Sequence, residues 1–312
     1  MNKDDTDASR HLHDEGQPGN VVTGEAGELA GQASLWGNAW KFLRKSPFFI
    51  VGSFLLLVLL LMAVVPQLFA RGIDPRACSL SDSRQPPSAA HWFGTDIQGC
   101  DYYANVIYGA RISLSIRVLS VVGILVVGVL IGALAGYFGG VTDSILARFT
   151  DVFFGIPLLL GALILLTVTA QRTIFTVSLA LVAFGWMTAM RLVRSSVIAI
   201  KHSEYVQAAQ ALGASTYRIL VRHILPNALA PVIIYATISI GVFIAAEATL
   251  TFLGIGLQAP EISWGLQINL GQNVFLTSPY LVLFPAGFLS VTVLAFIMLG
   301  DALRDALDPK RN

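Results

Sequence analysis

The stretch "FFIVGSFLLLVLLLMAVVPQLFA", residues 48–70, determines the class of this protein. It contains no charged residue, and about 20 apolar residues in a helix cross a hydrocarbon layer of about 30 Å. The whole 312-residue chain is similar in character, with 55% hydrophobic residues, 12% charged residues and a mean hydropathy of +0.69. Soluble domains average about a quarter charged residues. The composition therefore predicts an integral membrane protein, and the net charge of +1 gives no support for a nucleic-acid binder.

Five further apolar segments predict an all-α protein with six spans, the later ones at 113–137, 146–169, 174–195, 229–254 and 281–303. The first run is too long for the apolar region of a signal peptide, so we expect no cleavable leader. Residues 1–33 are polar and show no periodicity, which predicts a disordered tail.

Residues 34–47 connect this tail to the first span. Trp36, Trp40 and Leu43 fall on one helical face, next to the basic residues Lys41, Arg44 and Lys45. This pattern predicts a short helix lying in the membrane interface, and an ordinary juxtamembrane flank is the alternative. Lys and Arg also gather around 196–228 and after the sixth span, so both termini are expected in the cytoplasm. This excess of positive charge on the cytoplasmic side is weakened by several arginines that fall outside or near the outer face: Arg71, Arg76, Arg84, Arg111, Arg117 and Arg172.

The predicted extracytoplasmic loop, residues 71–112, carries both cysteines of the chain, Cys78 and Cys100. A disulfide can persist outside the cytoplasm, where thiols are not kept reduced. We predict this single bridge, and two unpaired thiols are the alternative. The spacing of the two cysteines does not indicate a metal site.

Small and ionisable residues within the spans are the next signals. Gly128, Gly132 and Gly136 line one face of the second span, which predicts close helix packing within the chain or with a partner. Glu247 lies inside the fifth span, where an ionisable group is costly and faces protein or water. It is a candidate for lining or gating a path, or for a structural hydrogen bond between helices. Asp151 either pairs with Arg148 or sits at the interface.

Catalytic motifs are missing from the sequence. The dipeptide Gly-Lys of a phosphate-binding loop does not occur, and neither does His-Glu-x-x-His nor Gly-x-Ser-x-Gly. We therefore expect no enzyme activity and no cofactor in this chain, and any energy for active transport has to come from elsewhere.

The polar stretch "EYVQAAQALGASTYRILVRHILPNALAP", residues 204–231, interrupts the apolar pattern. Ser203 is expected to cap a first helix starting at Glu204, which Gly213 ends. Ser215 is expected to cap a second helix that Pro226 ends. The composition of the first helix favours equally a groove on another protein and packing on the chain's own membrane domain.

This stretch resembles the "EAA…G…LP" loop of ATP-binding-cassette importer permeases, through Ala208-Ala209, Gly213 and Leu225-Pro226. Further motifs extend the resemblance to residues 40–308 and to the C-type permease of dipeptide and oligopeptide importers: "HWFGTD", "YGARISL", "AGYFGG" and "AEATLTFLGIG…SWG". The family implies a type I importer permease fold, with its core at 113–308 and a cytoplasmic tail at 309–312. Its coupling helix would use Glu204, Tyr205, Gln207, Ala208, Ala209, Leu212, Gly213 and Pro226 against an ATPase.

Two departures from the family pattern stand out. Gln207 occupies a position that is usually Glu, so Glu204 is expected to make the acidic contact instead. Cys100 stands in "TDIQGCD", where the family usually has an arginine, and a bridge to Cys78 would explain it.

The resemblance implies half of a heterodimeric peptide importer. Its partners would be a second permease, two ATPases carrying ATP and Mg²⁺, an extracytoplasmic peptide-binding protein and membrane lipid. A self-powered secondary transporter is the alternative, although it would call for broken or charged helices at matching points of two halves. A membrane scaffold without transport is a third reading. The family pattern is shared by dipeptide, longer-peptide, nickel-chelate and glutathione importers, so it leaves the solute open.

Overall fold

The computed structural model describes residue 37 and residues 39–307. The predicted disordered tail 1–33, Trp36 and the tail 309–312 lie outside the described residues. Within the described part the chain is helical and contains no strand, and the extended segments meet only in two isolated bridges, Cys78 with Cys100 and Thr95 with Asp101. The predicted all-α class is confirmed.

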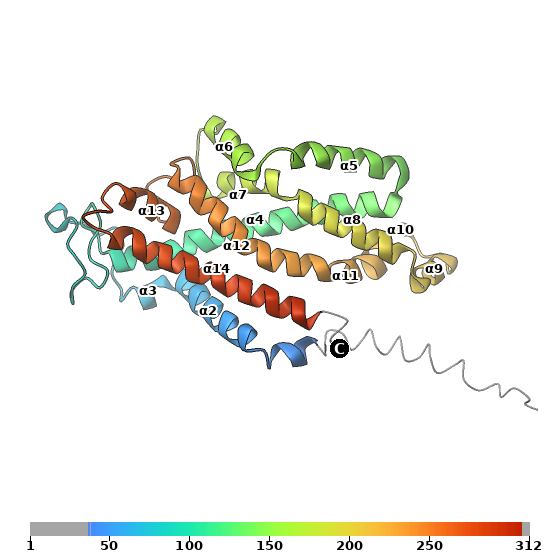
Figure 1. The fold of residues 1–312 in the computed structure, drawn as a ribbon, viewed down its shortest axis with the longest axis horizontal. Coiled ribbons are helices and arrows are strands. Elements are labelled where there is room, and N and C mark those ends of the chain that lie inside the picture. Colours follow the sequence, from blue (N-terminus) through green and yellow to red (C-terminus); the bar gives the residue numbers. More distant parts are fainter. Residues whose placement is uncertain (1–36, 38, 308–312) are drawn as a thin grey trace, which may run out of the picture.

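The helices form an elongated bundle in which α9 and α10 lie at one end and α13 lies at the other (Figure 1). In chain order the elements are α2 (Pro47–Val64), α3 (Pro66–Phe69), η1 (Leu80–Asp82), α4 (Tyr102–Phe138), α5 (Gly140–Phe154), α6 (Leu158–Val168), α7 (Ile174–Gly185), α8 (Met187–Lys201), α9 (Glu204–Ala211), α10 (Thr216–Arg218), the π-helix η2 (Ile219–Ile224), α11 (Leu225–Ala228), α12 (Ala230–Phe252), α13 (Trp264–Gln272) and α14 (Tyr280–Ala306).

Four of these helices, α2, α4, α12 and α14, are long and apolar enough to cross a membrane. The third and fourth predicted spans correspond to broken pairs, α5 with α6 bent by 80° and α7 with α8 bent by 49°, so the number of spans is four to six. The first break contains Pro157, which has no N–H to continue the helical hydrogen bonding.

Helix α4 starts before the apolar segment that was predicted to span from 113. α4 begins at Tyr102, where the Asp101 carboxylate caps it by accepting from the Ala104 N–H at 2.8 Å. The first turns of α4 are buried against other parts of the chain and include polar residues. Their mean hydropathy is therefore too low to mark them as part of an apolar segment. The segment between α3 and α4 therefore ends at Asp101, and the predicted loop boundary at 112 stays a prediction. We call residues 71–101 the outer segment, after the side of the membrane that the sequence predicts for them.

The stretch before the first span is helical at residues 39–43. Leu43 and Ala39 are buried against Ala302 and Ala306 at the end of α14, whereas Trp40 is 53% exposed. Helix α14 thus covers Leu43 and leaves Trp40, three positions before it, open. The helix predicted to lie in the membrane interface stays a prediction.

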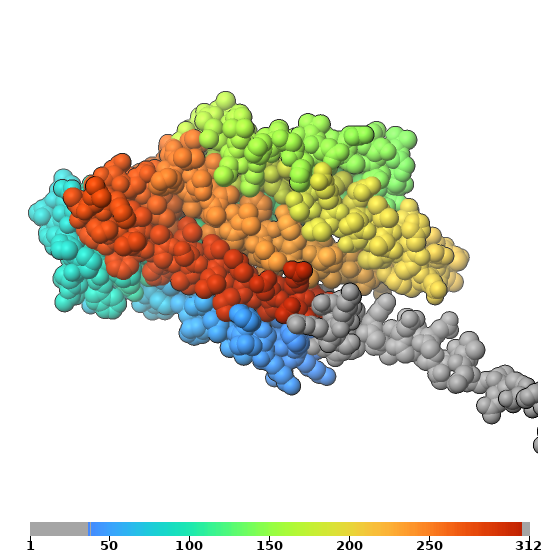
Figure 2. All heavy atoms as spheres, in the orientation of Figure 1, coloured from blue at the N-terminus to red at the C-terminus, as the bar shows by residue number. Residues whose placement is uncertain are grey.

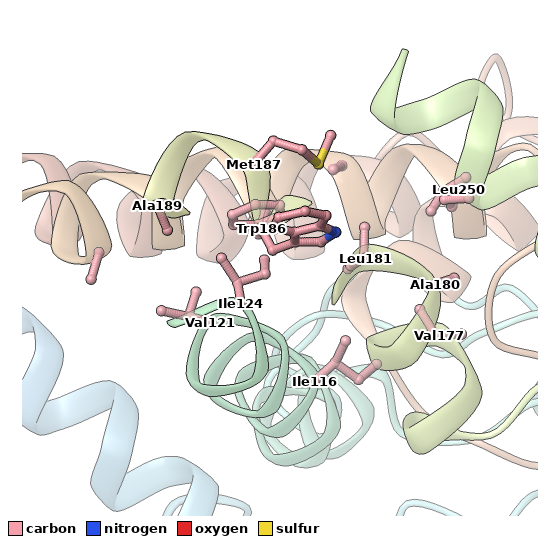
Figure 3. Packing of buried hydrophobic residues seen from close by; sticks show 14 of the residues in the cluster. Ile116, Val121, Ile124, Val177, Ala180, Leu181, Trp186, Met187, Ala189 and Leu250 are labelled. Carbon is pink, nitrogen blue, oxygen red and sulfur yellow. The ribbon is translucent and has the colours of Figure 1, made fainter. Parts of the chain in front are cut away.

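The largest buried cluster lies where α4, α7, α8 and α12 meet. Trp186 occupies the break between α7 and α8, and Figure 3 shows its indole ring among Ile124, Leu181 and Met187. A large aromatic ring fills the space that the bend opens, so the bent pair is held in place by packing.

The predicted glycine face of α4 packs on α8 of the same chain. A Cβ atom on Gly128 would lie 2.7 Å from the Cβ of Ala189, and one on Gly132 would lie 2.5 Å from the carbonyl oxygen of Met190. One on Gly136 would lie 2.8 Å from the carbonyl oxygen of Arg194. Because the backbones approach so closely, only glycine fits at these positions without a shift of the helices.

Candidate functional site

The polar segment 204–225 forms an end of the molecule, in yellow in Figure 2. Its first helix, α9, starts at Glu204 as predicted, with this carboxylate in the first turn. Ser203, however, makes no side-chain cap, because its hydroxyl donates to the carbonyl oxygen of Ile200 at 2.7 Å. The prediction of a Ser203 cap is therefore wrong, because the hydroxyl bonds to the end of the preceding helix α8 instead.

The end of α9 follows the predicted glycine elbow. Gly213 has a φ of +77°, a left-handed conformation that suits glycine. Its N–H donates to the Gln210 carbonyl, and the Ala214 N–H donates to the Ala209 carbonyl, which is the hydrogen-bond pair of a Schellman motif. The Ser215 hydroxyl then accepts from the Arg218 N–H at 3.4 Å and caps α10 as predicted.

The second predicted helix does not end at Pro226. The chain continues from α10 through the π-helix η2 into α11, with Pro226 in the first turn of α11. Proline is tolerated there because the first N–H groups of a helix need no partner inside it. Only Leu229 separates α11 from α12, so the segment leads into the following span with almost no break.

One face of the segment is anchored to the bundle. Val206, Ile219 and Ile224 are buried and pack with Val193 of α8 and Val232 of α12. The Asn227 amide also donates to the Tyr205 hydroxyl at 3.2 Å. The segment therefore contacts both neighbouring helices, α8 and α12, through its apolar side.

The opposite face of α9 is uncovered. The residues of this face recur at helical spacing and are small, uncharged or apolar except at the first position: Glu204, Gln207, Ala208, Ala211 and Leu212; Gln210 is exposed beside it. Leu212 is 88% exposed, and beyond the elbow Tyr217 is 75% exposed. Ala209 is half-buried, and the Gln207 amide donates to the His202 carbonyl at 2.9 Å. We call this surface the α9 face.

Ion pairs hold α8 to its neighbours near this end. Arg194 donates to both carboxylate oxygens of Asp143 in α5, at 2.5 and 2.6 Å. Arg191 donates to Asp151 at 2.8 Å, so the partner of Asp151 is Arg191 and the alternative partner Arg148 is wrong. The Lys201 ammonium group donates to the carbonyl oxygen of Tyr137 in α4. Helix α8 is thus fixed to α4 and α5 by polar contacts as well as by the glycine face.

Glu247 lies fully buried in α12, and the sequence analysis missed its partner. Arg117 of α4 has no exposed surface and lies with its Nη2 atom 3.6 Å from Glu247 Oε2. Thr251 donates to Glu247 Oε1 at 3.0 Å, and the Arg117 guanidinium lies 5.3 Å from the ring centroid of Trp264. Arg117 is therefore buried between α4, α12 and α13, and its predicted place near the outer face stays a prediction.

A signal for Arg117 existed in the sequence, because it lies inside the segment 113–137 that was itself predicted to span. A charged residue within a span points to an opposite charge in another span. Trp264 gave no comparable signal, since its indole N–H finds its acceptor, the Val106 carbonyl oxygen at 2.9 Å, only through the tertiary fold.

The outer segment 71–101 is closed by the bond between Cys78 and Cys100, whose Cα atoms lie 4.1 Å apart. The Tyr280 hydroxyl of α14 lies 3.0 Å from the carbonyl oxygens of both Gln85 and Thr95. These contacts hold the segment on the bundle beside α14. No group of three metal-ligating side chains occurs in residues 39–307.

The chain matches two protein families. Residues 128–312 match the family described as "Binding-protein-dependent transport system inner membrane component". Residues 34–87 match the "N-terminal TM domain of oligopeptide transport permease C".

Curated relatives agree over most of the chain. The oligopeptide transport system permease protein OppC of Bacillus subtilis is 38% identical over 94% of this chain and 96% of its own length. The dipeptide permease DppC of the same organism is 43% identical, covering 88% and 85%. The glutathione permease GsiD of Pectobacterium atrosepticum is 35% identical, covering 88% and 91%.

A solved structure shares the fold. The crystal structure of an amino acid ABC transporter with histidines superposes with a TM-score of 0.50 at 17% identity, covering 64% of this chain and 92% of that one. The family matches, the relatives and the helical bundle thus agree with the resemblance found in the sequence. The chain belongs to the binding-protein-dependent transport system inner membrane component family, as a membrane permease of an ATP-binding-cassette importer.

Proposed function

We propose that this chain is the C-type permease of a peptide importer and that its α9 face docks on a cytoplasmic ATPase. The peptide substrate rests on the relatives, which are permeases for oligopeptides, dipeptides and glutathione. The ATPase contact rests on the coupling-loop pattern, which coincides with a face that no part of the described chain covers.

The docking proposal depends on one observation, which is that α9 has a buried face on one side and an exposed face on the other. Val206 is fully buried, whereas Leu212 and Ala208 are exposed on the other side. An exposed leucine on a short helix of small residues fits a groove on a partner protein. Glu204 at the start of this face would supply the acidic contact, because Gln207 carries no charge and already bonds the His202 carbonyl.

The anchored face explains how such docking would do mechanical work. A push on α9 reaches α8 through Val193 and reaches α12 through the helical run that contains Pro226. The ion pair of Arg194 with Asp143 transmits it further to α5. Coupling between distant sites needs structural elements that move together. These contacts would make α5, α8, α9 and α12 move as one unit.

The remaining partners follow from the same proposal. A second permease would complete the translocation path, and two ATPases would hold ATP and Mg²⁺. An extracytoplasmic binding protein would deliver the peptide to the end that carries residues 71–101. Both chain termini then lie in the cytoplasm, in the bacterial inner or plasma membrane, and lipid covers the outer surface of the bundle.

Two leucines at opposite ends of the molecule provide a matched test of the docking face. Leu212 is 88% exposed on α9, and Leu276 is 96% exposed in the turn before α14. The tagged chain is purified gently from its host as the wild type, Leu212→Glu and Leu276→Glu, and the bound ATPase is quantified by mass spectrometry.

We expect the ATPase to accompany the wild type and Leu276→Glu in near-stoichiometric amounts. Leu212→Glu should lose most of it, at least about tenfold, because a buried charge without a partner costs more than 1.4 kcal/mol. Equal ATPase recovery with both variants would refute docking through this face. Peptide uptake into vesicles by the chain alone and without ATP would refute the importer and favour the secondary transporter.

A further inference from the structure

Helix α8 has one buried side and one exposed polar side. Val193 and Val197 are buried where α8 packs on the glycine face of α4. On the other side Thr188, Arg191 and Ser195 are exposed and recur at spacings of three and four residues, so they lie in one row along the helix. The described part of the chain leaves this row largely open.

Helix α5 extends the polar surface next to α8. Ser144 and Asp151 lie on one side of α5 and are both exposed. The Asp151 carboxylate accepts from Arg191 at 2.8 Å, and this pair borders a hollow of about 240 Å³ between the two helices. Figure 1 shows α5 along one edge of the bundle. We call Ser144, Asp151, Thr188, Arg191 and Ser195 together the polar face.

A second exposed side of α5 is apolar. Val141, Ile145 and Val152 are between 63% and 75% exposed, and they lie about a quarter turn from Ser144 and Asp151 at about 100° per residue. Residues of this kind suit the hydrocarbon of a membrane. The apolar and polar residues alternate along the same length of helix, so both sides lie at the same depth. They therefore need different surroundings, which are lipid on the apolar side and protein or water on the polar face.

The ion pair on the polar face argues against lipid as its cover. The side chains of Arg191 and Asp151 are 47% and 49% exposed. Arg191 uses one of its five N–H groups in a hydrogen bond, and the second oxygen of Asp151 accepts none from residues 39–307. Polar groups left open to hydrocarbon are costly, whereas water satisfies them. The hollow beside the pair has room for several water molecules, since each takes about 30 Å³.

The pair also lies deep along α8. Arg191 precedes Lys201, the last residue of this helix, by ten positions, which places it about 15 Å from that end at about 1.5 Å per residue. A hydrocarbon layer is about 30 Å thick. Measured from a boundary at Lys201, the polar face therefore reaches about the middle of such a layer.

We propose that the polar face of α5 and α8 lines the water-filled path by which the solute crosses the membrane. The nature of the solute rests on the proposed function, whereas the contact with water rests on the half-exposed ion pair. Hydroxyl groups and a charge pair offer donors and acceptors to a peptide backbone without selecting a side chain, which suits a carrier of many sequences. The path then avoids Glu247, which has no exposed surface.

Single cysteines test the contact with water. Ser195→Cys is compared with Ile145→Cys, and Thr188→Cys with Val152→Cys; each pair is matched in its distance from the helix end near α9. Membranes of the host are opened so that a charged methanethiosulfonate reaches both sides during ATP turnover, and the labelling rate of the captured chain is measured. The native cysteines are bonded to each other, so the unchanged chain gives the baseline.

We expect the two cysteines of the polar face to react at least about tenfold faster than their partners, because the reactive thiolate does not form in hydrocarbon. Equal rates within each pair would overturn the proposal, and so would slow labelling of the polar face by a covering partner chain.

A bulky residue separates a solute path from a mere water-filled crevice. Thr188→Trp should lower uptake of trialanine by host cells at least about tenfold, whereas Val152→Trp, at equal membrane levels, should leave it unchanged. Equal uptake by both variants would overturn the path. Fast labelling of the polar face in cells whose wild-type chain imports no trialanine would refute the proposed function alone, and import with slow labelling would refute the polar face alone.

Discussion

Removing one partner of the buried pair Arg117 and Glu247 is the sharpest test of how α4 packs against α12. Arg117→Met keeps an unbranched apolar stem but removes the guanidinium group, which leaves the Glu247 carboxylate with the Thr251 hydroxyl alone, at a site without exposure. Two charges 3.6 Å apart attract by about 5 kcal/mol at an effective dielectric constant of about 20. Breaking a buried pair in this way generally costs about 3–5 kcal/mol, because a charge is left uncompensated.

The double variant separates the charge from the space that the side chain fills. Glu247→Gln keeps the shape of the carboxylate and an oxygen for the Thr251 hydroxyl, so adding it to Arg117→Met removes both charges together. We expect each single variant to lose about 3–5 kcal/mol of unfolding free energy, and the double variant to lose no more than about 1–2 kcal/mol.

Unfolding in mixed micelles of increasing denaturing detergent, followed by tryptophan fluorescence, measures these three free energies. The cycle gives a coupling energy of about 3 kcal/mol or more if the pair is a true ion pair in a dry site. Additive losses, or a single variant as stable as the wild type, would refute the reasoning. Trp264 itself should report the change, because its ring lies 5.3 Å from the guanidinium.

Two further predictions concern packing and the outer segment. Gly132→Ala should destabilise the protein by about 1–3 kcal/mol because its Cβ would lie 2.5 Å from a backbone oxygen of α8, whereas Gly287→Ala in α14 has open space and should be neutral or slightly stabilising in the same unfolding assay; equal effects would refute the close packing. The outer disulfide closes a separation of 22 residues, so replacing both cysteines with serine should cost about 3 kcal/mol. A thiol reagent added from outside without reductant should label neither cysteine, and labelling of both would refute the bond.

Local signals in the sequence predicted the local structure of the segment 204–225 well. The elbow at Gly213 and the cap at Ser215 depend on a few neighbouring residues, which the sequence displays. Ser203 failed as a cap because the Ile200 carbonyl competes for its hydroxyl. Pro226 failed as a terminator because a proline that ends one helix also suits the first turn of the next, and the sequence alone does not distinguish these roles.

Long-range features were beyond the hydropathy pattern. Hydropathy showed only the apolar part of α4, because the first turns of a helix that is covered by the outer segment have no reason to be apolar. The break at Pro157 had a signal in the sequence that the hydropathy pattern did not use, whereas the break at Trp186 lies in a continuous apolar run and only packing reveals it. Arg117 was named among the outer arginines because the positive-inside rule counts charges without asking which of them has a partner.

The contacts between the two ends of the molecule bear on how a push at α9 would reach the outer side. Helix α12 continues from the segment 204–225 and carries Glu247, which joins it to α4 through Arg117. Trp264 at the start of α13 packs on the same guanidinium, and Gln267, one turn further along α13, lines a cavity between α13 and the outer segment. A relative movement of α4 and α12 would have to separate Arg117 from Glu247 or carry α13 with it. Separation costs several kcal/mol in a dry site, so joint movement is favoured, and we expect this cavity to change shape whenever the segment 204–225 moves.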